Sequence, residues 1–172
     1  LRIIGTHTDI TARKGAEGAI LALNQRLQLA IEAAGVGVFE YDFASQRYSW
    51  DERLCQLYEM SPDSYDGSRR AWLERIHPDD VAAITREFDR AIREDTLFDM
   101  EFRLQPQRGG KIRYIHSLAR VIRDDAGVPV RTVGMDWDVT EHKELVEALF
   151  EEKERLRITL HSIGDAVIST DA

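Results

Sequence analysis

The sequence contains a single cysteine, Cys55, among 172 residues, so no disulfide can form within the chain. No apolar run is long enough to cross a bilayer. Basic residues are outnumbered, and the formal net charge of −8 is the opposite of what a nucleic-acid-binding protein carries. Glycine-rich phosphate loops, nucleophile elbows and kinase signatures are all absent. We expect a cytoplasmic segment that is not itself an enzyme and that contacts neither nucleic acid nor membrane.

Metal-binding and acid–base patterns are also missing. The five histidines are scattered without metal-ligand spacing, so we predict no metal site. Two adjacent acidic pairs occur, at Asp79-Asp80 and at Asp124-Asp125. The first pair follows a helix start and the second lies in a hairpin turn, where carboxylates have structural roles. No residue is therefore predicted to be catalytic.

A repeat dominates what the sequence does contain. Residues 1–14 are matched by residues 130–143, and the offset of 129 positions continues to the pairs Gly35/Gly164, Val38/Val167 and Asp42/Asp171. A constant offset over this length indicates tandem copies of a whole domain. We therefore expect a piece of a longer protein. The predicted parts are the tail of one module (1–14), a linker helix (15–34), a complete module (35–140), a second linker helix (141–162) and the start of a further module (163–172).

The two linker segments have a heptad pattern of apolar residues. The first has Ala16, Ile20, Leu23, Leu27, Ala30 and Ala34, and the second has Leu145, Leu149, Glu152, Leu156, Thr159 and Ile163 at the equivalent positions. Two interpretations stay open. The helices pair in a homodimer, with Ile20, Leu23 and Leu27 in the contact, or each helix packs on its own domain.

The complete module changes from strand to helix patterns and back again. Strands are predicted at 36–43 and 47–50, helices at 51–60, 70–76 and from Pro78, and three further strands at 97–105, 111–123 and 128–139. Asp51 is the predicted cap of the first of these helices. This order favours an α+β fold, in which a five-stranded antiparallel sheet has its helices collected on one face.

The module resembles a PAS sensor domain with its C-terminal PAC segment, of the PAS_3 type. The resemblance is carried by Trp50-Asp-Glu-Arg-Leu, Ile76-His-Pro-Asp-Asp80, Glu101-Phe-Arg-Leu104, Gly110-Lys-Ile-Arg-Tyr-Ile-His116, Val121-Ile-Arg-Asp-Asp-Ala-Gly127 and Gly134-Met-Asp-Trp-Asp-Val-Thr-Glu-His-Lys143. It implies a curved antiparallel sheet, a ligand site between sheet and helices where a ligand is present, and signal output through the terminal helix.

The same resemblance implies a relay at the end of the last strand. Asp138 and Thr140 match the Asp-x-Thr element of the family, and Asp9 and Thr11 repeat it. Thr140 is a predicted N-cap of the following helix, and Asp138 is expected to accept hydrogen bonds or to meet a basic partner. We expect these residues to connect the sheet to the direction of the outgoing helix. The alternative is that they are only cap and turn residues.

No cofactor can be assigned from the sequence, and a small metabolite or no ligand is expected. The Asn-Cys-Arg segment of flavin photosensors is absent, and Cys55 fits a small core residue better. Haem is not expected either, because it needs an axial histidine: only His116 is a candidate, it fits an ordinary core or surface residue better, and His77 is expected to bond locally. The predicted pocket lining is Trp50, Tyr58, Tyr114 and His116, and Tyr48, Trp72 and Trp137 are further core or pocket candidates.

The resemblance implies a sensory and relay function in a bacterial multi-PAS signalling protein. Residues 154–171 resemble modules that precede cyclic-di-GMP synthesis or hydrolysis domains, which makes such an output the first expectation. A histidine kinase is the alternative output. A ligand-free dimerisation spacer with a filled interior is the alternative from another functional class.

Overall fold

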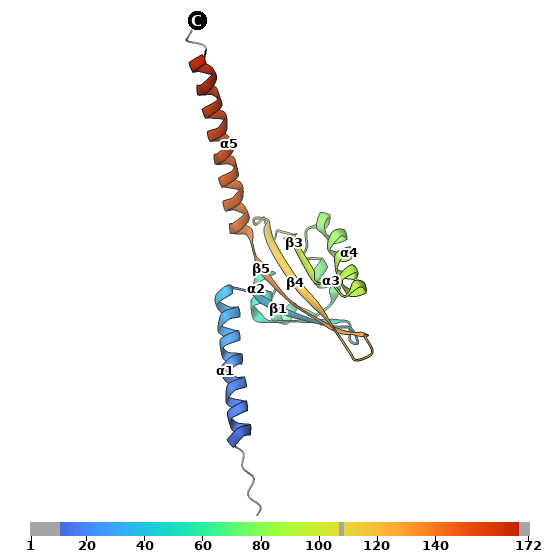
Figure 1. The fold of residues 1–172 in the computed structure, drawn as a ribbon. Helices are drawn as coiled ribbons and strands as arrows, with labels where there is room; N and C mark the ends of the chain where they lie inside the picture. Colours follow the sequence, from blue (N-terminus) through green and yellow to red (C-terminus); the bar gives the residue numbers. More distant parts are fainter. Residues whose placement is uncertain (1–10, 107–108, 169–172) are drawn as a thin grey trace, which may run out of the picture. The chain divides into compact units, whose positions relative to one another are not determined.

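The computed structural model describes residues 11–106 and 109–168, which separate into two compact units between Val36 and Gly37 (Figure 1). The first unit contains one long helix, α1 (Thr11–Ala34). The second contains all the strands and the remaining helices. Within the described ranges, no helix combines the length and hydropathy needed to cross a membrane.

Helix α1 confirms the predicted first linker helix and begins at Thr11, inside the expected module tail. It ends at Gly35, which has a φ of 65° and whose N–H donates to the carbonyl of Glu32 at 3.1 Å. Glycine is favoured at this position because the left-handed conformation strains any residue with a Cβ. The apolar side chains of α1 are exposed, Ile20 by 60%, Leu23 by 56% and Leu27 by 53%.

The second unit is built on a five-stranded antiparallel sheet with the order β2-β1-β5-β4-β3. Its strands are β1 (Gly37–Asp42), β2 (Arg47–Trp50), β3 (Phe98–Leu104), β4 (Arg113–Arg123) and β5 (Pro129–Asp138). The central strand β5 pairs with both β1 and β4. The sheet predicted from the sequence is therefore confirmed, with strand ends that differ by one or two residues.

Short helices and one longer helix lie between the strands β2 and β3 in the chain. They are α2 (Glu52–Leu57), the 3-10 turn Pro62–Ser64, α3 (Arg69–Leu73) and α4 (Pro78–Glu94). Asp51 caps α2 as predicted, since its Oδ1 accepts the N–H of Leu54 at 2.7 Å. His77 precedes α4 and bonds locally, accepting the N–H of Asp79 at its Nδ1.

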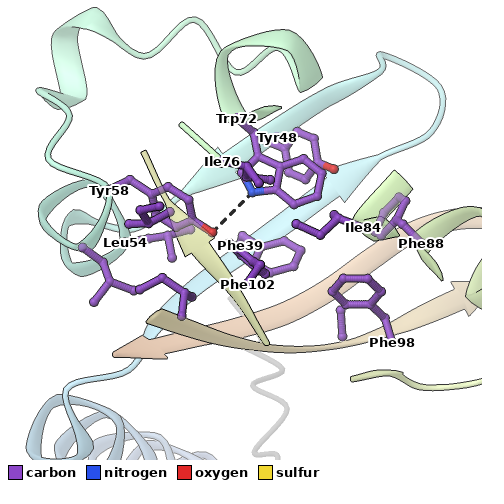
Figure 2. Close-up of a cluster of buried hydrophobic side chains, with 14 of the residues drawn as sticks. Phe39, Tyr48, Leu54, Tyr58, Trp72, Ile76, Ile84, Phe88, Phe98 and Phe102 are labelled. Carbon is purple, nitrogen blue, oxygen red and sulfur yellow. Dashed lines mark hydrogen bonds between the residues drawn. The ribbon is translucent and has the colours of Figure 1, made fainter. Parts of the chain in front are cut away.

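The core lies between the sheet and these helices (Figure 2). Because side chains alternate along a strand, one face of the sheet contributes apolar residues to this core and the other faces outward. The largest buried contributors are Phe39, Tyr48, Leu54, Leu57, Tyr58, Trp72, Ile76, Ile84, Phe88, Phe98, Phe102 and Ile115. At Gly134 of β5 a Cβ would come within 2.3 Å of the Phe39 ring, so a glycine is needed for this ring to cross the strand.

Helix α5 (Thr140–Ile168) follows β5 and confirms the second linker helix. Near its start, Lys143 Nζ lies 2.6 Å from Glu101 Oε2 of β3. Farther along, its large apolar side chains are exposed at Leu145, Val146, Leu149, Phe150, Leu156, Ile158 and Leu160. Residues 163–168, which were expected to begin a further module, continue this helix, and residues 169–172 lie outside the described part of the chain.

Candidate functional site

A buried hydrogen-bond chain joins the helices to the central strand. Tyr58, the residue that ends α2, donates its hydroxyl to Asp136 Oδ2 of β5 at 2.6 Å. Trp72 of α3 donates its indole N–H to the Tyr58 hydroxyl at 3.3 Å (Figure 2). Tyr58 is 0% exposed and Asp136 is 2% exposed. These three polar groups therefore form a connected network in the middle of an aromatic core.

Burial sets the electrostatics of this network. It raises the pKa of Asp136 from 3.8 to about 6, against the hydrogen bonds from Ser117 and Tyr58 that favour the ionised form. Burial also raises the pKa of the Tyr58 hydroxyl, which therefore stays protonated and acts as the donor. Ser117 of β4 lies directly opposite Asp136 in the sheet, which brings its hydroxyl close to the carboxylate. Even so, the second carboxylate oxygen, Oδ1, accepts no hydrogen bond of ordinary geometry.

A small cavity adjoins Asp136. Its volume is about 10 Å³, and it is lined by Phe39, Tyr48, Trp50, Trp72, Phe88, Phe98 and Asp136. A site for a drug-sized ligand spans at least roughly 300 Å³, whereas one water molecule needs about 10–15 Å³. This cavity therefore has room for a single particle of the size of water.

The four residues predicted to line the pocket lie in three different places. Trp50 lines the cavity, and Tyr58 belongs to the buried network beside it. Tyr114 and His116 do not line it, because β4 directs Ile115, Ser117 and Ala119 toward the core. The sequence of β4 shows which residues share a face of the strand, but not which of the two faces is buried. A wrong choice of face therefore places the exposed residues in the core and the core residues on the surface.

Tyr114, His116 and Trp137 instead lie on the outer face of the sheet. The His116 ring stacks on Trp137 with centroids 4.3 Å apart, and its Nε2 lies 2.7 Å from Asp99 Oδ1. Trp137 is thus not a core residue. A histidine on this face cannot be an axial ligand to a group held in the core.

The rim of the sheet contains a second polar cluster, built around Asp138. Arg113, the first residue of β4, donates to Asp138 Oδ2 through Nε at 2.9 Å and through Nη2 at 2.7 Å. The same guanidinium donates to the Leu57 carbonyl at the end of α2 at 2.8 Å. The sequence predicted a basic partner for Asp138, but only the register of β4 and β5 identifies it as Arg113.

The other oxygen of Asp138 holds the start of α5. Asp138 Oδ1 accepts the backbone N–H of Thr140 at 2.8 Å and also the Thr140 hydroxyl proton. The Thr140 hydroxyl oxygen in turn accepts the Tyr114 N–H at 2.9 Å. The predicted N-cap role of Thr140 is wrong, because Thr140 is already the first helical residue and its hydroxyl connects to β4.

Asp138 is ionised over a wider pH range than an ordinary aspartate. Partial burial opposes ionisation, but the Thr140 hydroxyl and amide and the Arg113 guanidinium outweigh this cost and lower the pKa of Asp138. Asp138 therefore stays charged at neutral pH and holds Arg113 and Thr140 together. The charged Asp138 thus links the start of β4 to the first residue of α5.

The end of α2 is linked to both carboxylates of β5, directly to Asp136 and through Arg113 of β4 to Asp138. The Leu57 carbonyl meets Arg113, which holds Asp138, and the adjacent Tyr58 hydroxyl meets Asp136. A movement of α2 therefore changes contacts at the core and at the start of α5 together. Neither Arg113 nor Asp136 was identified from the sequence, since an arginine or aspartate within a strand gives no signal of its partner.

Other predicted sites have different outcomes. Asp9 lies outside the described residues, and the side chain of its repeat partner Thr11 is also not described. Cys55 is buried in α2, where it was expected to be a core residue. Within the described part of the chain, no three His, Cys, Asp or Glu side chains converge into a metal-binding cluster.

Comparison with known proteins gives one consistent family. The model of the family described as "PAS fold" matches residues 47–135, slightly more than half of the chain. Among curated proteins, "Probable diguanylate cyclase DgcE" of Escherichia coli (strain K12) is 37% identical over 171 residues. "Sensor protein FixL" of Bradyrhizobium diazoefficiens is 29% identical over 150 residues. The matched regions cover 99% and 86% of this chain, but only 15% of DgcE and 29% of FixL.

Solved structures agree with this assignment. A sensory box histidine kinase/response regulator from Burkholderia thailandensis E264 superimposes with a TM-score of 0.63 at 27% identity, over 77% of this chain and 98% of that one. The N-terminal domain of a diguanylate cyclase with PAS/PAC sensor from Marinobacter aquaeolei gives 0.57 at 17% identity, over 63% and 98%, and shows the shared fold alone. Sequence, fold and family model thus converge, and the chain belongs to the PAS fold family of sensor domains.

Proposed function

We propose that this chain is a signal-relay segment of a cytoplasmic multidomain sensor, in which the PAS domain passes its state to an output domain through α5. The observation that carries the proposal is the double link of α2 to β5, direct at Asp136 and through Arg113 of β4 at Asp138. The contact at Tyr58 and Asp136 reports the state of the core, and the contact at Leu57 and Arg113 reaches Asp138. Two positions of α2, whose populations depend on a ligand or on a neighbouring module, would be enough to shift the equilibrium of an output domain.

The relay is tested by removing the guanidinium that joins α2 to Asp138. Arg113→Gln is expected to increase hydrogen exchange at residues 140–146, because the start of α5 loses the partner of its capping carboxylate. Arg123→Gln is the matched control, since Arg123 lies on the same strand and has an equivalent 2.9 Å contact with Asp95, away from α5. Equal exchange at residues 140–146 in both variants would contradict the relay and favour the spacer alternative.

The proposed output is synthesis or hydrolysis of cyclic-di-GMP. It is supported by the 37% identity to DgcE along nearly the whole chain. A histidine kinase output is the second candidate, supported by the 29% identity to FixL. The full-length protein decides between them, because cyclic-di-GMP turnover and autophosphorylation from ATP are separate assays. Arg113→Gln should change whichever rate is found, and Arg123→Gln should leave it unchanged.

We also propose that the full protein works as a homodimer, with α1 helices in contact through Ile20, Leu23 and Leu27. Each of these side chains is more than half exposed, and they follow the heptad spacing of a two-stranded coiled coil. Leu23→Glu is expected to weaken the dimer in sedimentation velocity measurements. Gln25→Glu, which adds the same charge outside the heptad seam, is the control. A monomeric wild-type protein at all concentrations would exclude this pairing.

By the repeat, Asp9 and Thr11 are proposed to act at the start of α1 as Asp138 and Thr140 act at the start of α5. The proposal rests on the shared offset of 129 positions. Asp9→Asn should then increase hydrogen exchange in the first turn of α1 without affecting α5. Unchanged exchange there would limit the relay to the second copy of the element.

A further inference from the structure

Asp136 has no positively charged partner. Among residues 11–106 and 109–168, no lysine, arginine or histidine forms a hydrogen bond or ion pair with it. Its donors are neutral hydroxyls, Tyr58 at Oδ2 and Ser117 beside it, and Oδ1 is left without a hydrogen bond of ordinary geometry. An ionised carboxylate buried in this way is costly unless a counter-charge or a proton accompanies it. In the described part of the chain, an ionised Asp136 is therefore not balanced by a paired cationic side chain.

The space for such a charge lies next to this carboxylate. The cavity that Asp136 lines has a volume of about 10 Å³, which matches one particle of the size of water. Tyr48 also lines it, and its buried hydroxyl is a second oxygen without a partner. The remaining wall consists of aromatic side chains, namely Phe39, Trp50, Trp72, Phe88 and Phe98.

The wall decides which cation suits the cavity. The faces of aromatic rings are electron-rich and attract cations, most strongly where water is excluded. Ca²⁺ and Mg²⁺ need six or more oxygen ligands, and K⁺ is held in channels by rings of carbonyl oxygens. Among the residues that line the cavity, only Asp136 and Tyr48 carry a side-chain oxygen. An ammonium ion, by contrast, is about the size of water and can donate its N–H groups to these oxygens and to ring faces.

We propose that this cavity is a binding site for the ammonium ion, with Asp136 as its counter-charge and the surrounding aromatic rings as its wall. Binding would neutralise Asp136 while the Tyr58 hydroxyl bond is retained. Because Tyr58 ends α2, occupancy of the site would be felt at the contact that leads to Arg113. That signalling consequence rests on the proposed function, whereas ammonium binding itself does not.

The test compares cations at constant ionic strength and about pH 7.5, where Asp136 is ionised. Ammonium chloride replaces sodium chloride stepwise while urea unfolding of the whole chain is measured. Ligand binding to the folded state lowers the unfolding equilibrium constant by the factor 1 + [NH₄⁺]/Kd, about tenfold at nine times Kd. Potassium chloride and methylammonium chloride should act as sodium chloride does, because the first lacks oxygen ligands here and the second exceeds the cavity.

Matched variants assign the effect to the site. Asp136→Asn should abolish the ammonium-specific stabilisation. Asp99→Asn removes an exposed carboxylate from the outer face and should respond as the wild type does. Arg113→Gln, which interrupts the proposed relay, should also bind ammonium normally, so that failure of the relay and failure of the site are distinguished. Equal stabilisation by potassium, or an ammonium effect that persists in Asp136→Asn, would overturn the proposal.

A direct measurement covers the case in which Asp136→Asn does not fold. In the wild-type protein, ¹⁵N-labelled ammonium should give nuclear Overhauser contacts from its protons to the ring protons of Tyr48, Trp72 and Phe98. Absence of these contacts at ammonium concentrations that saturate any stabilisation would show that water or a proton, not ammonium, accompanies Asp136.

Discussion

Two carboxylates on one strand, only two residues apart, have opposite environments. Asp136 is buried in the core with only neutral hydroxyl donors and no cationic hydrogen-bond partner, and its pKa is raised to about 6. Asp138 lies at the rim, where Arg113 and Thr140 surround it and its pKa is lowered. The same residue type on the same strand thus becomes a neutralisable group at one position and a permanent charge at the other.

The difference lies in what α2 offers at each depth. At the core, α2 ends with a tyrosine hydroxyl, which stabilises a carboxylate but adds no charge. At the rim, its last carbonyl is held by a guanidinium, which keeps the second carboxylate ionised. The proposed relay would therefore have an interior carboxylate that can gain or lose charge, joined through α2 to a fixed ion pair at the rim.

The largest expected effect comes from removing the charge of Asp136 altogether. In the wild type, the unfolded chain loses this proton near pH 4 and the folded protein keeps it until about pH 6. Unfolding therefore releases a proton in this window, and the free energy of unfolding falls as pH rises, by about 3 kcal/mol for a shift of this size. Asp136→Asn should lack this fall.

The measurement is urea unfolding at several values between pH 4 and pH 7 in ammonium-free buffer. Because other groups titrate as well, the informative quantity is the difference between variant and wild type at each pH. A difference that stays constant over this range would show that Asp136 titrates as an ordinary aspartate and that the contrast with Asp138 is wrong.

A smaller effect is expected when Asp136 keeps its charge but loses its donor. Tyr58→Phe removes the hydroxyl that bonds Oδ2 and also leaves the Trp72 indole N–H without its acceptor. Loss of a buried hydrogen bond to a charged group costs about 2 kcal/mol in the free energy of unfolding. The cost should be highest above pH 6, where Asp136 is ionised.

Tyr48→Phe is the matched control for this change. Tyr48 is also buried, but its hydroxyl has no hydrogen-bond partner, so its removal should leave stability unchanged or slightly increased. Equal destabilisation by the two substitutions would mean that packing, not the Tyr58–Asp136 bond, accounts for the effect.

Much of the fold follows from the sequence for identifiable reasons. Asp51 is followed by an apolar helix pattern, and it caps α2 as expected. Val81, Ile84, Phe88 and Ile92 have helical spacing, and in α4 Ile84 and Phe88 are fully buried. Local signals of this kind depend on residues close together in the chain, so one sequence is enough to interpret them.

The site depended on longer-range information. Asp136 and Tyr58 are 78 positions apart, and Arg113 is 25 positions from Asp138, so their contacts follow only from the strand pairing. The assignment of His116 to the interior failed for the same reason, because alternation shows which residues share a face but not which face is buried. Thr140 was correctly placed at the start of the outgoing helix, but it is the first helical residue and not the N-cap, and its hydroxyl bonds β4.

The smallest expected effect concerns the rim. Arg113→Gln removes two hydrogen bonds to Asp138 Oδ2 that are partly exposed to solvent, so the free energy of unfolding should fall by only about 1 kcal/mol at neutral pH. Since the folded-state pKa of Asp138 is lowered, the stabilisation from this pair is present above the unfolded pKa and is lost as pH falls through the folded value. The wild type and Arg113→Gln should therefore converge in strongly acidic solution, which is the reverse of the trend expected for Asp136→Asn. Urea unfolding of both variants over one pH series compares the two carboxylates directly. If the cost of Arg113→Gln instead stayed constant down to acidic pH, the guanidinium would act mainly through the Leu57 carbonyl, and α2 would be held at the rim without the help of Asp138.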